Sequence, residues 1–266
     1  MKQRIITGVL GGAGFLAFLW VGGWSYAGLI GVLATIGYME FCRMKKIPFY
    51  SLEGAVGLVL MWLILLTGLA ERGFLPPIWP LQVPNNILTG LVVLLTLIVI
   101  SRNRIQVEEV AYLFLGSLYI GFGFSYMIQT RLMTDGMIWS LLALTVTWAN
   151  DSGAYFMGKR WGKRKLWPSI SPNKTVEGSL GGMVLSLIIS GIIGLLFPEL
   201  GSLAAVLGIG LIISIVGPLG DLIESAVKRT TGVKDTGSLL PGHGGVLDRF
   251  DSLLLVFLVL HTIQLI

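Results

Sequence analysis

The chain has 266 residues, of which 54% are hydrophobic and 12% are charged, and its formal net charge is +5. Soluble domains average about 25% charged residues, so this composition excludes a soluble globular protein and predicts an integral membrane protein. The single cysteine, Cys42, excludes an intramolecular disulfide and a multi-cysteine zinc site.

Long apolar runs recur along the whole chain, and a helix needs roughly 20 residues to cross the hydrocarbon core. They predict an all-α, polytopic fold with nine transmembrane helices, at 5–21, 26–42, 52–70, 87–101, 107–130, 136–157, 176–197, 203–227 and 252–266. No small-residue cleavage motif and soluble domain follow the first run, so we interpret it as a retained helix and not as a signal peptide.

The basic residues orient these helices in the membrane. With a cytoplasmic N-terminus, every Lys and Arg except Arg72 and Arg131 falls in a cytoplasmic segment, which supports nine spans and an outside C-terminus. We expect one catalytic unit with three parts: an N-terminal scaffold at 1–101, a middle region with a basic cytoplasmic loop at 102–200, and a C-terminal region at 201–266. The first part has little chemistry beyond Glu40 and Glu53.

The basic loop follows the sixth predicted span. Asn150 and Asp151 lie near the cytoplasmic end of that span, and the Lys159 to Lys165 run fits topological anchoring and attraction to anionic lipid. Ser171 and Thr175 are candidate caps for the next helix, and Lys174 between them is a candidate phosphate ligand.

The eighth predicted span ends in a polar face. Asp221, Glu224 and Lys228 recur at three- or four-residue spacing, which places them on one side of a helix. Pro218, between glycines, is expected to kink or open this helix. An interfacial ion pair of Glu224 with Lys228 is the alternative interpretation, but a carboxylate as deep as Asp221 indicates a functional site.

The following segment gathers more ionisable groups among glycines. Its members are Arg229, Lys234, Asp235, His243, Asp248, Arg249 and Asp251. Carboxylates without a His or Cys cluster suit Mg²⁺, and Lys and Arg suit phosphate oxygens, so the segment predicts phosphoryl or nucleotidyl transfer. Capping of the last helix is an alternative role for Asp251.

Three blocks of this sequence resemble one enzyme family. SAVKR at 225–229, KD at 234–235 and PGHGGVLDRFD at 241–251 together are similar to the signature of the phosphatidate cytidylyltransferases, also called CDP-diacylglycerol synthases. SPNKTVEG at 171–178 and NDSGAY at 150–155 resemble the family's other polar blocks. The resemblance covers about 150–251, whereas the N-terminal spans resemble the family only in hydropathy.

The resemblance implies that CTP and phosphatidate react to CDP-diacylglycerol and pyrophosphate, with Mg²⁺ and in some members a monovalent cation such as K⁺. Asp221 and Asp248 would be the metal ligands. The catalytic group would comprise Asp221, Lys228, His243, Asp248 and Asp251. The substrate-binding group would comprise Asn150, Asp151, Lys174, Glu224, Arg229, Lys234, Asp235 and Arg249.

The expected partners are CTP, phosphatidate and membrane lipid, with no nucleic acid, and a homodimer is expected. The protein would lie in the cytoplasmic (inner) membrane with its active site toward the cytosol. Two alternatives are a transporter or channel with a cation-binding carboxylate, and a CTP-using membrane kinase that phosphorylates a polyprenol or similar alcohol.

Overall fold

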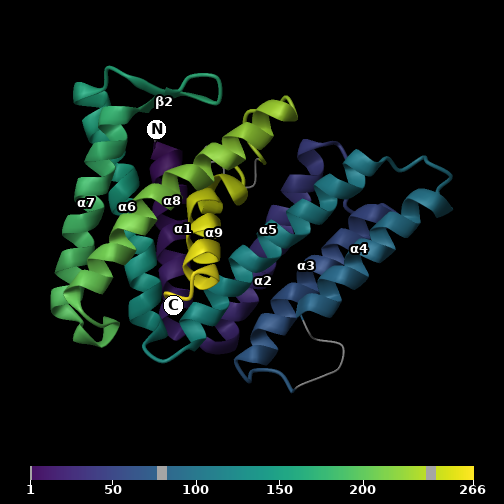
Figure 1. Cartoon of the computed structure of the whole chain (residues 1–266), viewed down its shortest axis with the longest axis horizontal. Coiled ribbons are helices and arrows are strands. Elements are labelled where there is room, and N and C mark those ends of the chain that lie inside the picture. The colour runs from purple at the N-terminus through teal and green to yellow at the C-terminus, as the bar shows by residue number, and fades with distance from the viewer. Residues whose placement is uncertain (1, 77–82, 238–243) are drawn as a thin grey trace. The chain divides into compact units, whose positions relative to one another are not determined.

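The computed structural model describes residues 2–76, 83–237 and 244–266. In these residues the chain forms nine α-helices and one small β-hairpin (Figure 1). Contacts divide it into two compact units, Met1–Met133 with Asp235–Leu247 and Thr134–Lys234 with Asp248–Ile266. Residues 235–237 and 244–247 therefore pack with the N-terminal helices, although they follow helices of the second unit in sequence.

The first unit is a helical assembly of α1 to α5. Its helices are α1 (Lys2–Val21), α2 (Gly23–Met44), α3 (Leu52–Glu71), α4 (Val83–Ile100) and α5 (Val107–Leu132). Ser51 caps α3 by accepting a hydrogen bond from the Gly54 N–H. Ser117 on α5 donates to the Gly57 carbonyl at 2.8 Å, and the small Gly57 allows α3 and α5 to approach closely.

The second unit holds the polar blocks. It contains α6 (Gly136–Trp161), β1 (Lys165–Trp167), β2 (Ser171–Thr175), α7 (Val176–Leu196), the 3-10 turn η1 (Pro198–Leu200), α8 (Leu203–Thr230) and α9 (Leu247–Thr262), whose first residue belongs to the other unit. α6 and α7 pack through glycines, since a Cβ at Gly153 would lie 2.7 Å from the Gly181 carbonyl oxygen. The hairpin lies at one end of this helix pair (Figure 1).

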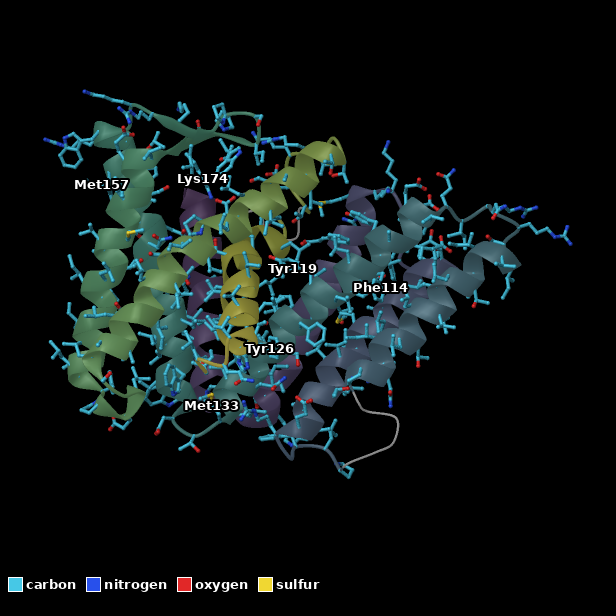
Figure 2. The ribbon with its side chains drawn as sticks, in the orientation of Figure 1. Phe114, Tyr119, Tyr126, Met133, Met157 and Lys174 are labelled. Carbon is cyan, nitrogen blue, oxygen red and sulfur yellow. The ribbon has the colours of Figure 1, made fainter. Side chains whose placement is uncertain are left out.

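The hairpin replaces part of the predicted basic loop. β1 and β2 pair antiparallel, with Lys165 opposite Thr175 and Trp167 opposite Ser171. Thr175 caps α7 through the Gly178 N–H, as predicted. Ser171 lies in β2, so the prediction that it caps the helix is wrong. Lys174, also in β2, is held next to α8 (Figure 2).

The all-α prediction is confirmed in its general form, because long apolar helices dominate the described residues. Five of these helices are long and apolar enough to cross a membrane: α2, α3, α5, α7 and α8. α8 runs through Pro218 as one helix, so the expectation that the proline opens the helix is wrong, whereas the expected kink stays a prediction. A proline removes one backbone donor, and packing against neighbouring helices allows a helix to tolerate that loss.

Candidate active site

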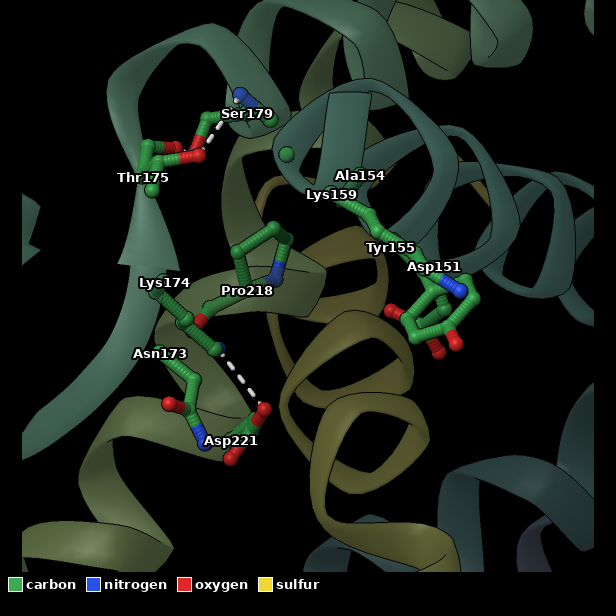
Figure 3. A pocket seen from close by; sticks show the side chains of 12 residues that line it. Asp151, Ala154, Tyr155, Lys159, Asn173, Lys174, Thr175, Ser179, Pro218 and Asp221 are labelled. Atoms are coloured by element: carbon green, nitrogen blue, oxygen red, sulfur yellow. Dashed lines mark hydrogen bonds and ion pairs between the residues drawn. The ribbon is translucent and has the colours of Figure 1, made fainter. Parts of the chain in front are cut away.

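A cavity of about 570 Å³ opens in the second unit. α6 lines it with Asp151, Tyr155 and Lys159, β2 lines it with Lys174, and α8 lines it with Asp221 (Figure 3). Lys159 was predicted to anchor the topology, but its place here adds it to the candidate site. In the sequence, the only sign of a role for Lys159 in the site was its position between the polar blocks at 150–155 and 171–178.

Lys174 and Asp221 form an ion pair in this cavity. The Lys174 Nζ lies 2.7 Å from Asp221 Oδ2 and donates to the Pro218 carbonyl at 3.0 Å (Figure 3). Ser225, one turn further along α8, donates to the other Asp221 oxygen at 3.2 Å. The Asp221 side chain remains 39% exposed, so its oxygens are accessible to a ligand.

Lys228 binds two carboxylates at once. Its Nζ lies 2.9 Å from Glu224 Oε1 and 2.7 Å from Asp248 Oδ1. All three side chains are nearly buried, at 12% exposed for Lys228, 6% for Glu224 and 7% for Asp248. The ion pair of Glu224 with Lys228 thus exists, but it also includes Asp248. Two carboxylates against one ammonium leave a net negative charge if both are ionised.

α8 and α9 touch at Gly220. A Cβ there would lie 2.5 Å from the Asp251 carbonyl oxygen and 3.0 Å from Ser252 Cα, so only glycine allows this approach. The contact brings the first turn of α9, which carries Asp251, against the turn of α8 that carries Asp221. The two acidic segments, separated by 30 residues or so in sequence, become neighbours.

Asp251 lies in a negatively charged environment. Burial raises the pKa of its carboxyl to about 7, the negative charges of Asp221 and Asp151 act in the same direction, and a hydrogen bond from the Ser252 N–H opposes them. α9 begins at Leu247, four residues earlier, so Asp251 is not its N-cap. The capping alternative for Asp251 is wrong.

Asn150 is not exposed to the cavity. Its side chain is fully buried, and neither its amide nitrogen nor its amide oxygen has a hydrogen-bond partner among the described residues. It lies against Gly182 of α7, where an added Cβ would collide with the amide oxygen. Asn150 therefore contributes to the packing of α6 against α7, with unused hydrogen-bonding capacity.

The remaining predicted residues lie at the surface or outside the described residues. Arg229 donates to the Ile170 carbonyl at 3.4 Å, which links the end of α8 to the hairpin. Lys234, Asp235 and Arg249 are exposed. His243 lies outside the described residues.

The residues present fit a divalent cation bound with water and phosphate. No group of three or more His, Cys, Asp or Glu side chains suited to a metal occurs in the part of the chain that the structure describes. Mg²⁺, however, is usually held by one or two carboxylates together with waters and substrate phosphates. Asp221 supplies an accessible carboxylate, and Asp251, whose pKa is raised first by burial and then by the charge of Asp221, is a second acid close to it.

Comparison with known proteins identifies the family. A model of the cytidylyltransferase family matches residues 2–266. The chain belongs to the cytidylyltransferase family. It is therefore a nucleotidyltransferase, and the resemblance noted in the polar blocks extends over the N-terminal helices as well.

Relatives of this cytidylyltransferase are similar over nearly their full length. A phosphatidate cytidylyltransferase of Bacillus subtilis (strain 168) is 44% identical over 257 residues, which cover 96% of this chain and 94% of the relative. One of Staphylococcus aureus (strain COL) is 39% identical over 264 residues, 99% of this chain and 98% of the relative. One of Staphylococcus haemolyticus (strain JCSC1435) is 38% identical over 265 residues.

Proposed function

We propose that the protein transfers the cytidylyl group of CTP to phosphatidate, giving CDP-diacylglycerol and pyrophosphate. A phosphate oxygen of phosphatidate attacks the α-phosphorus of CTP, the new P–O bond forms, and the bond from the α-phosphorus to the bridging oxygen breaks. The attacking oxygen is already ionised near neutral pH, so the reaction needs no strong general base. The pairing of Lys174 with Asp221 in the cavity supports this proposal most directly.

The main obstacle to this reaction is the repulsion between two polyanions. Asp221 and Asp248 would hold Mg²⁺, which would neutralise phosphate charge and orient the triphosphate; a monovalent cation such as K⁺ is a further expected cofactor. Lys174 and Lys159 present ammonium groups to the cavity and would bind phosphate oxygens. Arg229, Lys234 and Arg249 would attract the nucleotide from solvent.

Other polar residues would support these groups. Lys228 fixes Asp248, and Glu224 in turn fixes Lys228. Asp151 and Asp251 contribute negative charge that favours a cation at Asp221. Asp235 and His243 are assigned to the nucleotide-binding segment on the resemblance alone.

We further propose nine spans, a cytoplasmic N-terminus, an outside C-terminus and a site that faces the cytosol from the cytoplasmic membrane. The distribution of Lys and Arg supports this topology. Four aromatic side chains near the cavity, on α6 and the hairpin, are more than half exposed: Tyr155, Phe156, Trp161 and Trp167. Aromatic residues gather where lipid headgroups meet water, which fits a lipid substrate at this level. A homodimer remains part of the proposal.

Two differently labelled forms of CTP test the activity. Purified protein receives Mg²⁺, phosphatidate and CTP labelled either in the base or in the γ-phosphate. We expect base label in the lipid and γ label in pyrophosphate. Label from the γ-phosphate in the lipid would indicate a kinase instead, and ion flux in sealed vesicles without CTP would favour a transporter.

A further inference from the structure

A buried carboxylate on α2 contacts the part of the family signature that belongs to the first unit, namely the described residues 235–237 and 244–247, here called the signature segment. Glu40 is 4% exposed, in a helix of otherwise apolar character. Its Oε1 accepts a hydrogen bond from the Val246 N–H at 3.0 Å, and its Oε2 accepts from the Leu247 N–H at 3.1 Å. Thr236 donates its hydroxyl to Oε2 at 3.3 Å. Residues more than 190 positions apart in sequence thus meet at one side chain of the first unit.

These contacts compensate the cost of burying the acid. An ionised carboxylate is expensive to bury unless hydrogen-bond donors surround it, and donors to a charged acceptor form stronger bonds than neutral pairs do. Both oxygens of Glu40 have at least one backbone donor. The carboxylate therefore fits this segment better than a neutral side chain of the same size.

Two glycines of the segment leave room for the carboxylate. A Cβ at Gly237 would collide with Glu40 Oε1, and a Cβ at Gly245 would collide with Oε2. Neither glycine has a positive φ, so backbone conformation does not require glycine there. The contacts fall on both described stretches of the segment in this unit, 235–237 and 244–247.

The contact with Leu247 links Glu40 to the chemistry. Leu247 is the first residue of α9, and its N–H is one of those that a helix cannot satisfy internally. A carboxylate at this position also interacts favourably with the positive end of the helix dipole. The next residue along the chain is Asp248. The hydrogen bonds to Glu40 thus fix the backbone from which the Asp248 side chain projects.

We propose that Glu40 is a positioning residue for the transfer reaction, and that it acts through the backbone of Val246 and Leu247 on Asp248. The proposal rests on the proposed function, because it assigns Asp248 to the cation and triphosphate site. It gives the N-terminal helices a defined role in catalysis in addition to that of a scaffold.

The decisive substitution is Glu40→Gln, which keeps the shape of the side chain. A glutamine has only one acceptor oxygen, so its amide nitrogen would face a backbone N–H and at least one hydrogen bond would be lost. We expect kcat to fall about 10- to 100-fold and the half-saturating Mg²⁺ concentration to rise, as for residues that orient metal ligands. Glu40→Asp, which keeps the charge, should recover part of both.

Ser117→Ala is the matched control. Ser117 is also fully buried in the first unit, and its substitution also removes a hydrogen-bond donor, but its hydroxyl donates to the carbonyls of Gly57 on α3 and Leu113 on α5. Thermal unfolding is followed with a thiol-reactive dye, because Cys42 is the single cysteine and is buried. We expect similar unfolding temperatures for Ser117→Ala and Glu40→Gln, with near wild-type turnover and Mg²⁺ dependence only in the control.

The outcomes separate the two proposals. If the wild-type protein makes no cytidine-bearing lipid, the proposed function fails. If it does, and Glu40→Gln keeps wild-type kcat and Mg²⁺ dependence, the positioning role is wrong. It is equally wrong if activity falls only in step with the folded fraction.

If Glu40→Gln does not fold, two milder variants test the positioning role instead. Thr236→Val removes only one donor to the carboxylate, and Gly245→Ala crowds the same oxygen, Oε2, and the Thr236 hydroxyl beside it. We expect a lower kcat and a weaker response to Mg²⁺ in both variants. Wild-type values in both would overturn the proposal.

Discussion

Asp248→Asn is the sharpest test of the candidate site. Asp248 is bound by Lys228 at 2.7 Å, and the same ammonium lies 2.9 Å from Glu224. The substitution preserves shape and removes one negative charge. Lys228 retains Glu224 as a partner, and the asparagine oxygen can still accept a hydrogen bond, so no buried cation is left alone.

The expected effects on stability and on turnover differ in size. A hydrogen bond to a charged group contributes about 1.5–3 kcal/mol, and only part of it is lost when the neutral amide remains an acceptor. A loss near 1 kcal/mol corresponds to about 2–4 °C in unfolding temperature for a chain of this size. Loss of a metal ligand should instead reduce turnover by about 10³-fold, equivalent to about 4 kcal/mol in the barrier.

The assay measures pyrophosphate release and cytidine-bearing lipid with purified protein in detergent, alongside thermal unfolding. Asp135→Asn is the matched control, since Asp135 lies in the same unit and has a positive φ that asparagine tolerates. We expect full activity in the control and almost none in Asp248→Asn. Retained turnover in Asp248→Asn would exclude it from the metal site, and a collapse in stability that matches the loss of activity would assign it a structural role.

Three further predictions concern other parts of the site. Gly220→Ala should lower both activity and unfolding temperature because its Cβ meets the α9 backbone, whereas Gly208→Ala on the same helix, where nothing lies within 4 Å, should change neither. Lys174→Met should raise the KM for CTP at least about 10-fold because a phosphate ligand is lost, whereas Lys174→Arg should raise it less; steady-state kinetics check both. Because the Asp251 pKa is raised to about 7, metal-free protein should lose stability as the pH rises from about 4 to 7, and Asp251→Asn should make this slope smaller in thermal unfolding with a chelator.

The sequence predicted the helices and the acidic face well, because both depend on local patterns. Each predicted span overlaps a helix of the described residues, although α9 begins and ends earlier than the predicted span 252–266. The three- or four-residue spacing of Asp221, Glu224 and Lys228 placed them on one side of α8, and the structure pairs the last two. Thr175 was recognised as a cap from residue type and position.

The pairing between distant segments was not predictable in the same way. Nothing in the spacing shows that Lys174 reaches Asp221, because that contact depends on a hairpin within a segment rich in charge. Glu40 was noted only as an exception within the predicted scaffold, although an acid inside a predicted apolar span is itself a signal of a functional role. Two of its partners are the backbone N–H groups of Val246 and Leu247, and no sequence motif marks such groups because every residue but proline has one.

The ion pairs also bear on how the nucleotide enters. The accessible acid, Asp221, already has a lysine beside it, as does the buried acid Asp248. Lys174 and Lys228 are thus already paired with carboxylates. A triphosphate without a metal ion would add negative charge that these two lysines could not neutralise without leaving their partners. We therefore expect an exchange of counterions, in which CTP arrives together with its Mg²⁺ and the lysines and carboxylates change partners. Calorimetric titration should then show CTP binding in Mg²⁺ and almost none in chelator, and equal affinity in both would contradict it.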